Sequence, residues 1–136
     1  MTKNELLDIA AKARENAHSP YSKFKVGAAL LCDDGKVYTG CNVENASYGA
    51  TICAERVAFG NAVCDGERKF TAIAIVGGYE GDINTPCYPC GMCRQVMSEF
   101  CSGEFEIVLK SGGDTVTCKL NDVLPFAFLL NEKESK

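Results

Sequence analysis

The chain has 136 residues, of which 46% are hydrophobic and 24% are charged. These values are ordinary for a globular protein and too apolar for a disordered chain, so we expect a single domain that spans residues 1–136. The formal net charge is -4, from 14 basic and 18 acidic side chains. This acidic balance offers no electrostatic footprint for a polyanion, and we expect no nucleic-acid partner.

The N-terminal segment MTKNELLDIA mixes charges into an amphipathic pattern, and no apolar stretch approaches the length of a membrane span. We therefore expect a cytoplasmic protein with no membrane partner. The nine cysteines fit this expectation, because thiols in the cytosol stay reduced and are free, metal-bound or catalytic. Five of them stand singly and are expected to behave as small hydrophobic side chains: Cys32, Cys41, Cys64, Cys101 and Cys118.

The first part of the chain predicts a helix followed by a β-hairpin. Thr2 and Glu5 form a capping-box pattern, and apolar residues at helical spacing continue the helix to about Ala17. Two extended apolar stretches follow at 25–32 and 36–42. The Asp-Asp-Gly sequence between them is a hairpin-turn signal.

Helices and strands alternate in the rest of the chain. Helices are expected over 51–64, over about 89–101 and from Asn121, with strands over 70–76, 105–109 and 115–120. The segment 77–89, which is rich in glycine and proline, is expected to be a loop. The interleaved order predicts an α/β fold, a three-layer α/β/α sandwich with a mixed, about five-stranded sheet.

Two cysteine motifs stand at the expected starts of helices. Cys90 and Cys93 form a C-x-x-C pair, where backbone N–H groups and the helix dipole favour thiolates. That pair alone fits zinc binding and redox chemistry equally well. Cys53, with Glu55 two residues later, adds the first element of the zinc-deaminase pattern, a His or Cys before a glutamate and a later P-C-x-x-C. Together the two motifs favour zinc.

The chemistry of hydrolysis explains each part of this pattern. Three protein ligands, Cys53, Cys90 and Cys93, leave the fourth tetrahedral position of Zn²⁺ open for water. Glu55 would lie beside the metal without binding it, and could move a proton from the water to a leaving nitrogen. The only histidine, His18, lies outside both motifs, so we expect one zinc ion on three cysteines.

A second model stays open because P-C-x-x-C occurs twice, at 86–90 and at 89–93. If Cys87 joined the other three cysteines, the site would be a closed structural Cys₄ site with no position for water. That model leaves Glu55 without a role. We therefore favour the three-cysteine site.

The charge of such a site raises a further expectation. Three thiolates on Zn²⁺ give a formal charge of about -1, which weakens the metal as a Lewis acid. Arg56 and Arg94 each follow a motif directly. We expect at least one of them to donate hydrogen bonds to a zinc-bound thiolate.

Five sequence blocks resemble the cytidine deaminase family, in its short single-domain form with three cysteine ligands. The blocks are SPYSKFKVGAAL at 19–30, GCNVENASY at 40–48, CAER at 53–56, PCGMCRQV at 89–96 and VLPFAF at 123–128. The resemblance implies zinc-dependent hydrolysis of cytidine and 2′-deoxycytidine to uridine and 2′-deoxyuridine with release of ammonia, a reaction of pyrimidine salvage. It also implies that Glu55 is the proton shuttle and that Cys53, Cys90 and Cys93 are the ligands.

The same resemblance implies a substrate site and an assembly. Its expected members are Asn42 and Glu44 at the ribose 3′-hydroxyl, Phe24 against the pyrimidine, the backbone of Ala54 at the base, and Ala46 and Tyr48 near the ribose 5′ side. Short members of the family form homotetramers in which a C-terminal phenylalanine, here Phe128 or alternatively Phe126, enters a neighbour's pocket.

Two residues depart from the family pattern. Tyr88 stands where the family usually has Ser or Thr, and Cys87 is not part of the usual motif. Two other functions are kept beside the first. One is a deaminase of another aminated heterocycle, and the other is a non-catalytic, zinc-stabilised interaction domain.

Overall fold

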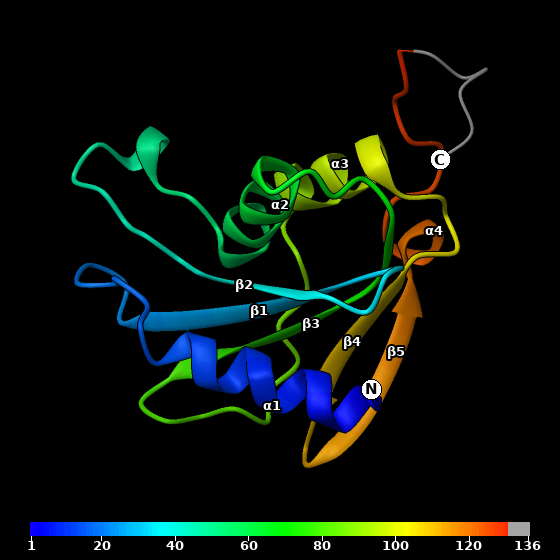
Figure 1. Cartoon of the computed structure of the whole chain (residues 1–136). Helices are drawn as coiled ribbons and strands as arrows, with labels where there is room; N and C mark the ends of the chain where they lie inside the picture. The colour runs from blue at the N-terminus through cyan, green and yellow to red at the C-terminus, as the bar shows by residue number, and fades with distance from the viewer. Residues whose placement is uncertain (131–136) are drawn as a thin grey trace.

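The computed structural model of the chain describes residues 1–130 and places a five-stranded sheet between two layers of helices (Figure 1). Across the sheet the strands are β2 (Val37–Cys41), β1 (Phe24–Cys32), β3 (Phe70–Tyr79), β4 (Glu106–Ser111) and β5 (Asp114–Lys119). The pair β3 and β4 is parallel, and the other neighbouring pairs are antiparallel. The predicted α/β/α sandwich with a mixed sheet is confirmed.

The helices divide between the two faces of the sheet (Figure 1). One face is covered by α1 (Lys3–Arg14), and the other by α2 (Ala54–Cys64) and α3 (Gly91–Phe100). Two short elements complete the fold, the 3₁₀ helix η1 (Tyr48–Ala50) and α4 (Leu120–Val123). Among residues 1–130, no helix combines the length and apolar character that crossing a membrane requires.

Alternation along the central strands builds the two layers. On β1, Ala28 and Leu30 pack toward α2 and α3, whereas Ala29 packs toward α1. On β3, Ile73 and Ile75 face the same way as Leu30. Burying each of the larger side chains Leu30, Ile73 and Ile75 contributes about 1.5–3 kcal/mol. The apolar cluster on the α2 and α3 side is the larger of the two.

Two glycines let both helical layers approach the sheet backbone. A Cβ on Gly27 of β1 would lie 2.1 Å from the carbonyl oxygen of Ala10 in α1. A Cβ on Gly40 of β2 would lie 2.3 Å from the carbonyl oxygen of Ala54 in α2. Gly40 therefore fixes the distance between β2 and the first turn of α2.

Two predicted boundaries are corrected. The first helix ends at Arg14 rather than near Ala17, because His18 leaves the helical path and forms a parallel bridge with Val43. The third strand continues beyond the predicted 70–76 to Tyr79, since Gly77 and Gly78 extend the pairing with β1. The capping box at Thr2 and the positive φ of Gly35 in the hairpin turn agree with the predictions.

All nine cysteines are free thiols. Of the five single cysteines, Cys32 and Cys101 are buried and Cys41 and Cys118 are half-buried. The prediction is wrong for Cys64, which is exposed at the end of α2.

Candidate metal centre

Both cysteine motifs stand at helix N-termini on the same side of the sheet. Cys53 is the N-cap of α2, and Cys90 is the N-cap of α3. Neither residue makes the side-chain hydrogen bond that usually caps a helix. Cys93 lies in the first turn of α3 and is almost fully buried. Two helices thus present their thiols and their positive dipole ends to one point.

The distances between the sulfurs suit a metal ion. Cys90 Sγ lies 3.8 Å from Cys53 Sγ and 3.5 Å from Cys93 Sγ, and all three sulfurs lie within 4.8 Å of one another. Tetrahedral zinc with bonds of about 2.3 Å holds its thiolates about 3.8 Å apart. The three sulfurs therefore fit zinc without rearrangement of the backbone.

Cys87 lies near this group but outside it. Its Sγ faces Gly77 of β3, where an added Cβ would come within 2.7 Å of the sulfur. Burial raises the pKa of Cys87 to about 12, with the charges of Glu55 and Cys53 adding to the effect. A neutral thiol packed against a strand favours the three-cysteine model over the closed Cys₄ site.

The first turn of α2 stabilises negative charge on sulfur. Hydrogen bonding from the Cys93 thiol and, to a lesser extent, from Arg56 lowers the pKa of Cys53 to about 5. The Nη2 atom of Arg56 lies 3.6 Å from Cys53 Sγ, in donor geometry. These contacts favour the thiolate form of Cys53, and the hydrogen bond to Cys53, together with burial, raises the pKa of Cys93.

Arg94, the second predicted partner of the thiolates, makes other contacts. Its Nε donates to the Pro89 carbonyl at 2.7 Å, and its Nη1 donates to the Val123 carbonyl at 2.7 Å. These bonds tie the start of α3 to the end of α4. The structure thus directs Arg56 to the sulfurs and Arg94 to the backbone, because the side chain of Arg94 turns toward the C-terminal segment.

Glu55 is buried beside Cys53, with only 4% of its surface exposed. Burial raises the pKa of its carboxyl to about 7, and the charge of Cys53 acts in the same direction. A carboxyl group in such a place can both accept and donate a proton near neutral pH. This is the environment of an acid-base group rather than of a surface glutamate.

Asn42 is buried at the end of β2 and uses both ends of its amide on β1. Its Oδ1 accepts from the Val26 N–H at 2.8 Å, and its Nδ2 donates to the Phe24 carbonyl at 2.8 Å. Each end retains one further hydrogen-bonding position. Asn42 therefore has a structural role, and its family role at a sugar hydroxyl would use the remaining positions.

Glu44 lines a cleft of about 410 Å³ with Tyr21, Ser22 and Tyr48. Its carboxylate accepts from the backbone N–H groups of Tyr21 at 3.0 Å and Ser22 at 3.1 Å, and also from the Ser22 hydroxyl. The Ser22 hydroxyl is the main reason that the pKa of Glu44 is lowered. Sequence reasoning missed Ser22 as a partner of Glu44, although both lie in family-like blocks.

The other predicted substrate residues differ in exposure. Phe24 is half-buried and packs edge-on against Tyr79, with ring centroids 4.9 Å apart. Ala54 is fully buried at the start of α2. Ala46 and Tyr48 are exposed, and Tyr48 packs edge-on with Tyr21. Tyr88 is more than half exposed.

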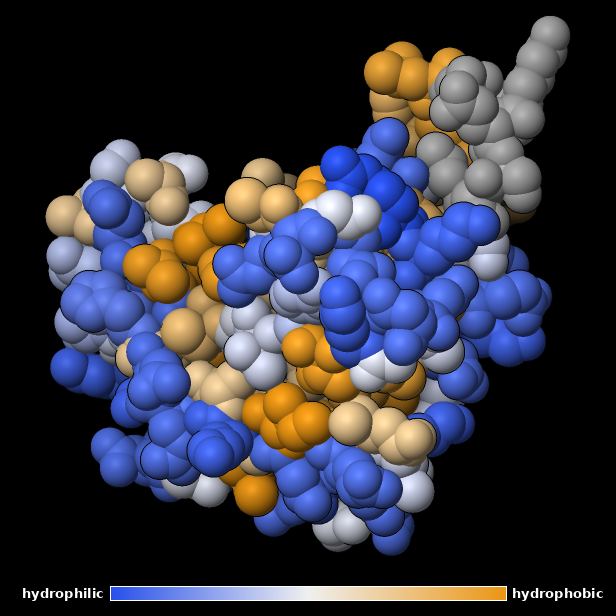
Figure 2. All heavy atoms as spheres, in the orientation of Figure 1, coloured by the Kyte–Doolittle hydropathy of each residue, from blue (hydrophilic) through white to orange (hydrophobic). Residues whose placement is uncertain are grey.

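Two aromatic residues project from the C-terminal segment. Phe126 is fully exposed and Phe128 is 69% exposed, which is unusual for such side chains. Gln95 of α3 donates to the Phe128 carbonyl at 3.0 Å and holds this part of the segment. Figure 2 shows the segment as an apolar projection at the upper right.

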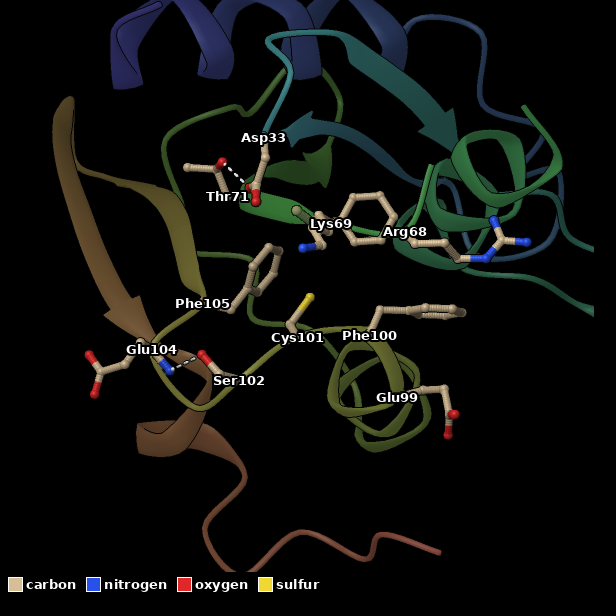
Figure 3. Close-up of a pocket in the computed structure, with 11 residues that line it drawn as sticks. Asp33, Arg68, Lys69, Thr71, Glu99, Phe100, Cys101, Ser102, Glu104 and Phe105 are labelled. Carbon is tan, nitrogen blue, oxygen red and sulfur yellow. Dashed lines mark hydrogen bonds between the residues drawn. The ribbon is translucent and has the colours of Figure 1, made fainter. Parts of the chain in front are cut away.

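A larger cleft, of about 670 Å³, lies at the opposite ends of the helices (Figure 3). Phe100, Cys101 and Phe105 line it, together with the charged residues Arg68 and Glu99. Burial raises the pKa of Cys101 to about 12, so this thiol stays protonated. None of the predicted site residues lines this cleft.

Comparisons with known proteins extend over both cysteine motifs. The family model "Cytidine and deoxycytidylate deaminase zinc-binding region" matches residues 1–109. A cytidine deaminase of Sporosarcina psychrophila is 50% identical over 129 residues, which cover 94% of this chain and 92% of the relative.

Two solved structures show the same fold over nearly the whole chain. The crystal structure of cytidine deaminase from Burkholderia pseudomallei has a TM-score of 0.86 and 51% identity, and the match covers 94% of this chain and 100% of that chain. The crystal structure of cytidine deaminase from Mycobacterium tuberculosis has a TM-score of 0.81 and 42% identity, and the match covers 96% of this chain and 99% of that chain.

Proposed function

Because the chain belongs to the cytidine and deoxycytidylate deaminase zinc-binding family, we propose that it hydrolyses cytidine and 2′-deoxycytidine to uridine and 2′-deoxyuridine. One water is consumed, and the exocyclic amino group leaves as ammonia. The observation that carries the proposal is the meeting of three cysteine sulfurs beside the buried carboxyl of Glu55. This pairing of a metal-binding group with an acid-base group is what a hydrolytic deaminase requires.

Cys53, Cys90 and Cys93 would hold one Zn²⁺ per chain. The sulfur spacing and the donor set support this assignment. When bound, zinc supplies a Lewis acid that assists the attack of water on C4 of the cytosine ring. Arg56 would draw negative charge from Cys53 and keep the metal electrophilic.

Glu55 would move the proton of the reaction. It accepts a proton from the attacking water and passes it to the amino nitrogen, so that ammonia leaves as a neutral molecule. Its burial supports this role, because a carboxyl group shielded from solvent exchanges its proton with the substrate rather than with bulk water.

The remaining predicted residues would bind the nucleoside. Glu44 and Asn42 would bind the 3′-hydroxyl, since a carboxylate accepts and an amide can donate to a sugar hydroxyl. Phe24 and the backbone of Ala54 would contact the base, with Ala46 and Tyr48 near the 5′ side. The cleft that contains Glu44 and Tyr48 supports a sugar site at this place.

Substitution of Glu55 by Gln tests the central claim. We expect zinc content to stay at the wild-type level and ammonia release from cytidine to fall by about 10²- to 10⁴-fold, the usual contribution of a positioned acid-base group. Wild-type turnover in Glu55→Gln would remove Glu55 from the mechanism. A wild-type protein that binds zinc but releases no ammonia would favour the non-catalytic interaction domain.

Glu44→Gln separates nucleoside deamination from action on another heterocycle. We expect the variant to raise KM for cytidine and 2′-deoxycytidine while any activity on free cytosine stays unchanged. An equal effect on nucleosides and on the free base would mean that Glu44 does not recognise the sugar. Glu80→Gln, an exposed glutamate after β3, is the matched control.

We also propose that the protein is a single-domain subunit of a homotetramer and acts in the cytoplasm in pyrimidine salvage. The exposed apolar side chains of Phe126, Phe128 and Leu130 support an assembly that covers them. Nine unpaired cysteines support a reducing compartment. Residues 131–136 of the proposed domain lie outside the described part of the chain.

A further inference from the structure

Cys32 occupies an unusual position for a buried thiol. It lies at the end of β1, just after the register shift between Leu31 and Cys32, and only 1% of its surface is exposed. Within residues 1–130 it is the one buried hydrophobic residue that belongs to neither apolar core cluster. The hydrogen bonds to sulfur in this range lie at Cys53, Cys90 and Cys93, so the Cys32 thiol is buried without a partner.

The Cys32 thiol points toward two carboxylates. Its Sγ and one oxygen each of Asp34 and Glu67 all lie within 4.8 Å of one another. Asp34 belongs to the hairpin turn between β1 and β2, and Glu67 belongs to the loop between α2 and β3. Residues far apart in the sequence thus place one sulfur and two oxygens around a common point.

The hairpin turn is bonded both to the loop that carries Glu67 and to the start of β3. The Asp33 N–H donates to the Lys69 carbonyl at 3.0 Å, and the Thr71 hydroxyl donates to the Asp33 carboxylate at 2.8 Å. Figure 3 shows the second of these bonds. The side chain of Asp34 is held by the Lys36 N–H at 3.0 Å. The Asp34 carboxylate is therefore held in place, and the hairpin turn is held against the segment that carries Glu67.

The two carboxylates of the cluster, on Asp34 and Glu67, have one ion-pair partner among the described residues. Lys36 Nζ lies 3.8 Å from Glu67 Oε2, but the Lys36 side chain is largely exposed. Asp65 adds a further carboxylate on the same loop, where it accepts from the Tyr38 hydroxyl. Arg68 and Lys69 follow Glu67 on the same loop, but the ion pair to the cluster comes from Lys36. A divalent cation would relieve the repulsion between the neighbouring carboxylates of Asp34 and Glu67.

We propose that Cys32, Asp34 and Glu67 form a second metal site for a divalent cation of the zinc class. Zinc accepts both thiolate and carboxylate ligands, whereas magnesium and calcium take oxygen ligands and leave a thiol unused. Binding would release the proton of the Cys32 thiol to solvent and form the metal–sulfur bond.

This site is distinct from the cysteine cluster. Cys53 precedes α2 and Glu67 follows it, so the two sites are separated by the length of an 11-residue helix, roughly 16 Å at a rise of about 1.5 Å per residue. The inference goes beyond the proposed function, because it concerns metal binding away from the reacting groups.

Metal counting on the whole protein tests the proposal. Wild type and variants are loaded with excess Zn²⁺, desalted and measured by plasma mass spectrometry. We expect a second zinc equivalent in wild type that is missing from Cys32→Ser and Glu67→Gln, with the first equivalent retained. Cys118→Ser, which removes another partly buried free thiol, is the matched control and should keep both equivalents.

Cadmium provides an independent readout. The ultraviolet thiolate-to-cadmium band of wild type should exceed that of Cys32→Ser by the contribution of one thiolate, and Cys118→Ser should match wild type. If Cys32→Ser fails to fold, Asp34→Asn and Glu67→Gln alter exposed or half-buried side chains and still decide the question. A single zinc equivalent in wild type, or a second equivalent kept in both carboxylate variants, would overturn the proposal. Ammonia release enters neither readout, so failure here is distinct from failure of the proposed function.

Discussion

Arg56 Nη2 donates to the sulfur of Cys53 across the first turn of α2, at 3.6 Å. Hydrogen bonds to charged groups contribute about 1.5–3 kcal/mol, which corresponds to about 10- to 150-fold in rate. We therefore expect Arg56→Gln to lower kcat on cytidine by this factor. Steady-state kinetics with parallel zinc analysis checks the prediction.

Arg94→Gln is the comparison for that variant. Its guanidinium donates to the Pro89 and Val123 carbonyls. Its loss should therefore lower the melting temperature and leave kcat almost unchanged. Equal kinetic effects of the two substitutions would contradict the different roles assigned to these arginines. So would an Arg56→Gln variant with unchanged kcat.

Cys87→Ser should keep full zinc content and at least most of the activity. The Cys87 thiol packs on Gly77 and lies outside the three-sulfur group. Cys90→Ser should lose both zinc and activity, because it removes the sulfur that lies within 4 Å of both other ligands. Metal analysis of the two variants separates the models, and loss of zinc from Cys87→Ser would restore the closed Cys₄ site.

Two glycine substitutions should act in opposite directions. In Gly40→Ala the new Cβ would meet the Ala54 carbonyl at 2.3 Å, which pushes α2 away and should lower both stability and zinc affinity. Gly60→Ala, on an exposed position within α2, meets nothing within 4 Å. It should stabilise the protein by about 0.5–1 kcal/mol through helix propensity. Urea unfolding with zinc titration measures both, and a stabilised Gly40→Ala would show that β2 and α2 can separate freely.

Phe128, rather than Phe126, should complete a neighbouring subunit's site. Phe128→Ala should raise KM for cytidine, whereas Phe126→Ala should leave KM unchanged. Co-expression of Phe128→Ala with Glu55→Gln gives the sharper measurement. An inactive Glu55→Gln chain still carries Phe128, so mixed tetramers should regain the low KM that Phe128→Ala lacks, at sites whose Glu55 is intact. No recovery in mixed tetramers shown to form would rule out this exchange.

Much of the fold could be predicted because local patterns decide it. The capping box at Thr2, the turn at Gly35 and the apolar run that became β3 each depend on a few neighbouring residues. Contacts between distant residues could not be predicted in this way. Arg14, for example, is buried and donates to the carbonyls of Lys25 and Gly78, although its sequence context is an ordinary helix end.

The site shows the same division. The spacing of Cys53, Glu55 and the C-x-x-C pair predicted a metal centre whose sulfurs the structure brings together. The choice between Arg56 and Arg94 depended on side-chain direction, which sequence adjacency does not encode. The two hydrogen bonds of the Asn42 side chain to β1 could not be predicted from the sequence either. They form just beyond the end of β2, where the side-chain amide pairs with the backbone of β1.

The two cysteine N-caps have a consequence for how the protein opens locally. Since Cys53 and Cys90 make no capping hydrogen bond of their own, the first turns of α2 and α3 depend on whatever binds their sulfurs. Chelation should therefore fray both helices from the same end at once. Amide hydrogen exchange should quicken over residues 54–57 and 91–94 together, while the strands beneath keep their protection. A zinc ion bound here would stabilise the N-termini of both helices at once.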